Sequence, residues 1–145
     1  MVEIPPEIQI SATLFPGSVF YFVEELLTSD EPHYFVTLNK NPITDVLLLM
    51  VCSTSKLDKV RLQNINNKLD ETLIEVSPSE YSEFSTISIF DCNSVFLKTV
   101  SELVSKLSDG KLKLKSKIPD NILEKLRTVV KASPVIPGAQ KRILD

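Results

Sequence analysis

The segment that decides the fold is Ile87-Ser88-Ile89-Phe90-Asp91-Cys92-Asn93-Ser94-Val95-Phe96, an apolar and β-branched run with one carboxylate in its middle. Its composition predicts a buried strand over residues 86–96, around which the rest of the chain is arranged. Burying an unpaired aspartate costs several kcal/mol. Asp91 is therefore expected at the rim of the sheet, in a hydrogen bond, or in a functional role.

Strand patterns precede this segment. Aromatic and β-branched runs predict strands at residues 18–23, 33–38, 45–53 and 72–76. A turn-rich connection follows residue 38, so the second and third strands are expected to form a hairpin. The third run is so uniformly apolar that both of its faces must be covered. The polar segment 56–69 is compatible with a short helix or a long loop.

A helix pattern follows the central segment. Over residues 99–107 the apolar side chains recur at the spacing of one helix face. Thr99 and Glu102 have the spacing of a capping box at its start, and Asp109-Gly110 is a typical helix end. These signals together predict an amphipathic helix.

The remaining segments complete the predicted fold. Leucines alternate with lysines at residues 112–115, which is typical of an edge strand protected by charge. A second helix is predicted over residues 121–132 and one further helical turn over residues 139–144. The first 15 residues contain prolines and alternating apolar positions, which favour an arm or at most a short edge strand.

The order of these elements predicts one domain over residues 1–145, with an N-terminal arm at 1–13 and a C-terminal tail at 134–145. Strands and helices do not alternate regularly, which is typical of the α+β class. We expect a small, strongly bent antiparallel sheet or half-open β-barrel, with a short inserted helix and a C-terminal helix.

Composition limits the classes of function. The chain has 145 residues, a net charge of −3 and no apolar run long enough for a membrane span, so a soluble, cytoplasmic protein without a membrane partner is expected. Three scattered glycines form no phosphate-binding loop. Cys52 and Cys92 lie in apolar strands, as reduced buried thiols do, and the chain has one histidine. No metal and no cofactor is predicted.

Charge is unevenly distributed along the chain. From Lys111 onward there are nine basic side chains against three acidic ones. This segment could face phosphates or an acidic protein tail, or its lysines could simply solvate a strand edge and a helix. Glu24, Glu25, Asp30 and Glu31 cluster in one predicted loop and are expected to be a solvated face.

Two groups of residues are candidates for a site. His33 begins a predicted strand and has a side chain that titrates near neutrality, so it could be a general acid or base, with a structural role as the alternative. Ser53-Thr54-Ser55-Lys56 follows an apolar strand directly. Hydroxyls, backbone amides and a lysine at a strand end can hold a phosphate, although capping of a turn explains the same residues.

Taken in order, four motifs resemble the MazF/PemK-like toxins of type II toxin–antitoxin systems. They are Pro16-Gly17-Ser18-Val19, the strand at 33–38, Val51-Cys52-Ser53-Thr54-Ser55, and Ser88-Ile89-Phe90-Asp91 with the helices that follow. The resemblance extends over about residues 14 to 132. It implies an SH3-like β-barrel, usually a homodimer, that cuts single-stranded RNA without a metal. It also implies an antitoxin protein that blocks the site.

The resemblance assigns roles to individual residues. Thr54 and Ser55 match a Thr-Ser pair beside the family's RNA-binding groove, and Asp91 matches an acidic residue beside the scissile phosphate. His33-Tyr34 stands where the family commonly has Arg-Pro, and Ile89 stands where it has an arginine that acts on the phosphate.

Metal-free RNA cleavage proceeds by attack of the 2′-hydroxyl on the adjacent phosphate, and it needs a base, an acid and a cation. Under the resemblance, Asp91 or His33 would transfer protons. Lys56, Lys59 or Arg61 would supply the cation from the neighbouring loop. Ile89 in place of the arginine predicts weak or absent catalysis. The alternative is a non-catalytic barrel module that binds a protein partner or nucleic acid.

Overall fold

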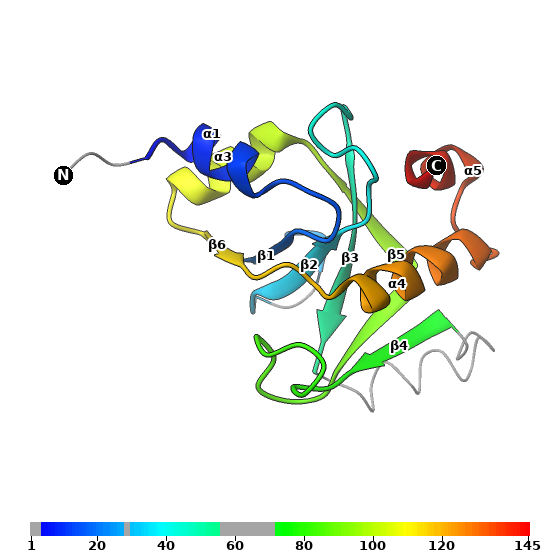
Figure 1. Ribbon diagram of the computed structural model, residues 1–145. Coiled ribbons are helices and arrows are strands. Elements are labelled where there is room, and N and C mark those ends of the chain that lie inside the picture. Colours follow the sequence, from blue (N-terminus) through cyan, green and yellow to red (C-terminus); the bar gives the residue numbers. More distant parts are fainter. Residues whose placement is uncertain (1–3, 28–29, 56–71) are drawn as a thin grey trace.

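The computed structural model describes residues 4–27, 30–55 and 72–145 (Figure 1). The elements in these ranges are α1 (Pro6–Thr13), β1 (Val19–Phe22), β2 (His33–Thr37), β3 (Leu48–Thr54), β4 (Leu73–Val76), β5 (Ser88–Lys98), α3 (Val100–Ser108), β6 (Leu112–Lys115), α4 (Asp120–Ala132), α5 (Gly138–Lys141) and a 3₁₀ turn, η2 (Arg142–Leu144). The α+β class predicted from the sequence is confirmed. The predicted helix or loop at 56–69 lies outside the described residues.

The described strands form one antiparallel sheet in the order β4-β5-β3-β2-β1-β6. The predicted hairpin is confirmed, because β2 pairs with β3. Among the described strands, the lysine-bearing β6 pairs only with β1 and lies at an edge, as its alternation of leucine and lysine predicted. The other edge of the described sheet is β4. Within these ranges β4 and β6 do not pair with each other, so the sheet is open rather than closed as a barrel.

A bulge in β5 bends the sheet at Asp91. Val51 of β3 pairs with Val95, but Ser53 pairs with Phe90, so four residues of β5 lie opposite the single Cys52. The Asp91 carboxylate accepts hydrogen bonds from the Asn93 backbone N–H at 3.0 Å and from the Ser94 hydroxyl at 3.4 Å. Such a bulge increases the local twist of a strand. Asp91 is therefore hydrogen-bonded, which is one of the three environments expected for it.

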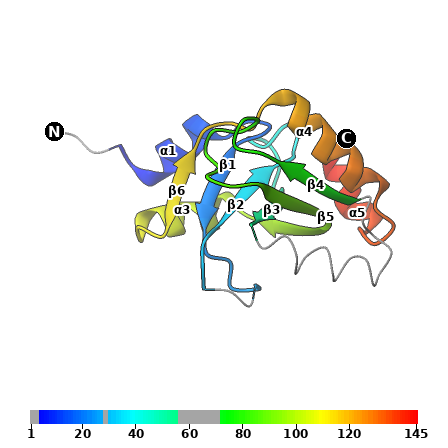
Figure 2. The same cartoon turned by 90° about the horizontal axis from the view of Figure 1, so that it is seen from below.

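The sheet separates two apolar clusters. On one face, α1 and α3 lie side by side and contribute Ile10, Leu14 and Leu103 to a cluster with Phe20, Phe22 and Phe35 (Figures 1 and 2). On the other face, α4 and the C-terminal segment pack against residues of β1, β2, β3 and β5. The strand β3 contributes residues to both clusters. The expectation that both faces of this strand are covered is confirmed.

The N-terminal segment contains the helix α1, so the predicted alternative of a short edge strand was wrong. Pro5 and Pro6 stand at the N-cap and first helical position of α1, where a missing N–H is tolerated. Ile10 and Leu14 are buried four residues apart, which matches the spacing of one helix face. With only these two apolar anchors, the helical period was too short to distinguish from strand alternation.

The helix α3 begins with the predicted capping box. The Thr99 side chain accepts from the Glu102 backbone N–H at 3.1 Å, and the Glu102 carboxylate accepts from the Thr99 backbone N–H at 3.3 Å. The chain leaves the helix at Gly110, which has φ of 72°. A positive φ is readily adopted by glycine, so Gly110 turns the chain from α3 into β6.

Replacing Thr99 by alanine is expected to lower the free energy of unfolding by about 1 kcal/mol, because the first turn of α3 loses its side-chain acceptor. Denaturant titration measures this change. Thr128→Ala, on an exposed position of α4, is the matched control and should leave stability unchanged or slightly higher. Equal effects of the two substitutions would contradict the capping role.

The buried Arg127 of α4 binds the C-terminal segment. The Arg127 guanidinium donates to the carbonyl oxygens of Leu38 and Leu144. Leu144 is fully buried. The helical turn predicted at 139–144 is confirmed by α5 and η2.

Candidate functional site

Four predicted site residues lie around one pocket. His33, Ser53, Thr54 and Ser55 line a cavity of ≈ 270 Å³. In an antiparallel hairpin the start of one strand lies beside the end of its partner. The register that pairs Phe35 with Cys52 therefore brings the start of β2 next to the end of β3. The hairpin itself is the reason that residues some twenty positions apart share this pocket.

Hydroxyl groups also reach the pocket from the segment before β5 and from the first residue of that strand. Ser85, Thr86 and Ser88 line it together with the predicted serines and threonine of β3. Polar lining of this kind suits a ligand with many hydrogen-bonding oxygen atoms, such as a phosphodiester and its ribose. These three residues were not among the predicted site residues, because it is the pairing of Ser53 and Thr54 with Phe90 and Ile89 that brings the start of β5 to the end of β3.

An aromatic wall borders the pocket. Tyr21 and Tyr34 both line it, and their ring centroids are 4.6 Å apart. Phe84 packs edge-on against Tyr34 at 5.0 Å, and the Tyr34 hydroxyl donates to the Glu83 carbonyl oxygen at 3.0 Å. Burial raises the pKa of Tyr34 above its ordinary value, so the phenol stays protonated. The wall is held in place by packing and by this hydrogen bond.

A cation lies against the aromatic wall. The Lys115 Nζ is 5.3 Å from the Tyr21 ring centroid and 5.9 Å from that of Tyr34. The neighbouring Lys113 is the register partner of Tyr21 on β1. From the sequence, these lysines were predicted to protect a strand edge, or to face phosphates or an acidic protein tail, and they were not connected with the tyrosines. The signal that could have identified them was the strand order, which places β6 next to the strand that carries Tyr21.

Asp91 lies outside the pocket around His33. It is not among the residues that line this pocket, and its carboxylate accepts the hydrogen bonds that close the β5 bulge. The neighbouring Asn93 donates to Thr72 and accepts from Ser133 of the chain after α4, so the bulge also joins β4 to the C-terminal segment. Ile89 is fully buried. The remaining predicted site residues, Lys56 and Arg61, lie outside the described residues.

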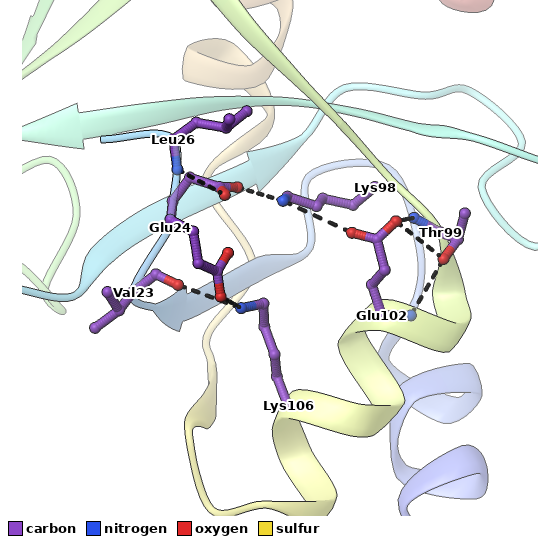
Figure 3. Close-up of polar contacts among 8 residues, drawn as sticks. Val23, Glu24, Leu26, Lys98, Thr99, Glu102 and Lys106 are labelled. Carbon is purple, nitrogen blue, oxygen red and sulfur yellow. Dashed lines mark hydrogen bonds and ion pairs between the residues drawn. The ribbon is translucent and has the colours of Figure 1, made fainter. Parts of the chain in front are cut away.

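The acidic loop after β1 is not a simple solvated face. Glu24 is 1% exposed and forms an ion pair with Lys98 at the end of β5, and it accepts from the Leu26 backbone N–H (Figure 3). The prediction that Glu24 is solvated was wrong. Its neighbour Glu25 is exposed, and a hydrogen bond from Lys106 lowers the pKa of the Glu25 carboxyl to about 2.

The two thiols are poor candidates for chemistry. Burial, reinforced by the charges of Asp91 and Glu24, raises the pKa of Cys52 to about 12, and burial raises the pKa of Cys92 to about 12 as well. A thiol is nucleophilic only as the thiolate. Both cysteines are free, as predicted. Among the described residues, no group of three His, Cys, Asp or Glu side chains is arranged to hold a metal ion.

No family model matches the chain, and no curated protein matches it. Within the described ranges, none of the helices has both the length and the apolar composition that crossing a bilayer requires.

Proposed function

We propose that the chain is a toxin-like, metal-independent endoribonuclease that binds single-stranded RNA at the pocket around His33. One observation supports this proposal. The imidazole of His33, several hydroxyl groups and the rings of Tyr21 and Tyr34, which we call the tyrosine wall, line one pocket, and Lys115 lies against those rings. Aromatic faces beside cations are a common platform for unpaired bases and their phosphates.

The proposed chemistry uses the 2′-hydroxyl of the substrate as the nucleophile. A base removes its proton, the 2′ oxygen bonds to the adjacent phosphorus, and the 5′ oxygen of the next nucleotide leaves with a proton. The products are a 2′,3′-cyclic phosphate and a 5′-hydroxyl. His33 would transfer protons, and Lys115 would stabilise the charge that develops on the phosphate.

The resemblance to MazF/PemK-like toxins adds finer proposals. Under this resemblance, we propose an SH3-like half-open barrel that forms a homodimer. An antitoxin protein would cover the pocket. The open, bulged antiparallel sheet is compatible with it. A catalytic role for Asp91, and roles for Lys56 and Arg61, stay predictions of the resemblance.

The test compares RNA with DNA of the same sequence. Purified protein is incubated with long single-stranded RNA and with single-stranded DNA in EDTA. We expect the RNA to be cut and the DNA, which lacks the nucleophile, to be bound but left intact. Intact RNA at every protein concentration would contradict the enzymatic proposal.

A second candidate is a nucleic-acid-binding module without chemistry. It is favoured by the position of Asp91 in the bulge and by the full burial of Ile89, where the resembling family has a phosphate-binding arginine. Strongly salt-dependent RNA binding without any cleavage would select this candidate.

A further inference from the structure

A second cavity adjoins the first. It has a volume of ≈ 510 Å³, and two of its lining residues, Tyr21 and Pro32, also line the pocket around His33. The two cavities therefore share a wall, and Tyr21 forms part of it. We call the second one the lysine cavity, because Lys106, Lys111 and Lys113 line it.

The local fold explains why these lysines share one cavity. Lys106 lies in the last turn of α3, and Gly110 then turns the chain so that Lys111 and Lys113 return along β1. The pairing of Lys113 with Tyr21 fixes the distance between this basic strip and the tyrosine wall. The cavity is thus lined by the end of α3, by the turn at Gly110 and by the paired strands β1 and β6.

The three lysines differ in how they are engaged. Lys106 donates to the Glu25 carboxylate at 2.9 Å and to the Val23 carbonyl oxygen at 3.3 Å (Figure 3). Lys111 and Lys113 are exposed, and within the described ranges neither ammonium group has a hydrogen bond or an ion pair. Two cations are therefore available to an anion from solution, and the third is held by a carboxylate.

Glu25 occupies the position that a ligand anion would take on Lys106. Its side chain is 74% exposed, so releasing it to solvent costs little. A phosphate entering the cavity would exchange with this carboxylate on Lys106. Glu25 therefore competes with a ligand phosphate for the Lys106 ammonium group.

We propose that the lysine cavity is a second subsite that binds phosphodiester groups of the same RNA strand, on the far side of Tyr21 from the pocket around His33. This inference rests on the proposed function and extends the proposed RNA-binding site from one nucleotide to several consecutive nucleotides. A strand that crosses the tyrosine wall would place one phosphate near Lys115 and the following ones near Lys111 and Lys113.

The test measures affinity and its salt dependence for 2′-O-methyl RNA, which binds but cannot be cut, as a dinucleotide and as a longer oligonucleotide. In the double variant Lys111→Gln/Lys113→Gln, the slope of log affinity against log salt should fall by about 1.4 for the longer strand, roughly 0.7 per lost phosphate contact. The dinucleotide, held at the first pocket, should lose little. Glu25→Gln should bind the longer strand more tightly than the wild type.

Matched controls separate the site from overall charge. Lys40→Gln/Lys141→Gln removes the same charge from residues that line neither cavity, and Glu7→Gln is the corresponding control for Glu25→Gln. Equal slopes for the two double variants would overturn the second subsite while leaving RNA binding intact. Wild-type protein that binds neither oligonucleotide would overturn the proposed function and the subsite together.

Discussion

Replacing Glu24 by leucine is expected to lower the free energy of unfolding by about 3–5 kcal/mol, because it leaves the Lys98 ammonium buried without its partner. Lys98 is 7% exposed, and its other carboxylate contact, Glu102, is 3.7 Å away and about half exposed (Figure 3). That remaining contact is too long and too solvated to replace the lost one. Denaturant titration measures the change.

The double variant Glu24→Leu/Lys98→Met distinguishes an unpaired charge from a general packing defect. Replacing both partners of a buried ion pair by apolar residues is often neutral, so most of the lost stability should return. Lys117→Gln, which breaks an exposed pair with Asp120, is the control and should cost less than about 1 kcal/mol. A double variant as unstable as the single one would contradict the assignment to charge burial.

Replacing His33 by glutamine is expected to lower the rate of RNA cleavage by about 10²–10⁴-fold, which is the usual contribution of a general acid or base. Glutamine keeps hydrogen-bonding capacity but cannot transfer a proton. The affinity for uncleavable RNA should change much less than kcat, because the hydroxyls and the tyrosine wall of the pocket remain. Single-turnover cleavage and separate binding measurements distinguish the two quantities.

Asp91→Asn is the informative comparison for His33→Gln. Asparagine retains one oxygen that can accept the Asn93 backbone N–H, so the bulge should survive. On the structural account this variant cleaves RNA at nearly the wild-type rate. A loss as large as that of His33→Gln would instead assign Asp91 the proton-transfer role that the resemblance implies.

Local signals were sufficient where the cause of the structure is local. The capping box at Thr99, the helix end at Gly110 and the hairpin turn after β2 depend on residues a few positions apart, and all three were predicted. The helix α1 was missed because Ile10 is its one buried residue, and Leu14, at the C-cap, adds only one further buried apolar position. Glu24 was misjudged because its partner, Lys98, lies at the far end of β5.

The candidate site likewise combines residues that the sequence predicted with residues that only the strand pairing identifies. His33 was selected because an imidazole titrates near neutrality, and Ser53 to Ser55 because hydroxyls at a strand end can hold a phosphate. The hairpin then brings them to one pocket. Lys115 and the two tyrosines were missed, because their meeting depends on β6 pairing with β1 rather than with any strand near it in sequence. The bulge at Asp91 was also hidden, since an acidic residue in an apolar strand does not reveal that four residues will lie opposite one.

The central claim is that RNA binds across the pocket around His33 and the tyrosine wall, and NMR titration of the ¹⁵N-labelled protein with an uncleavable single-stranded RNA tests it most directly. The account predicts amide shift changes concentrated at residues 53–55 and 84–88 and at Tyr21 and Tyr34. Changes confined to the exposed apolar loop around Ile43 and Val46, or none at saturating RNA, would contradict it.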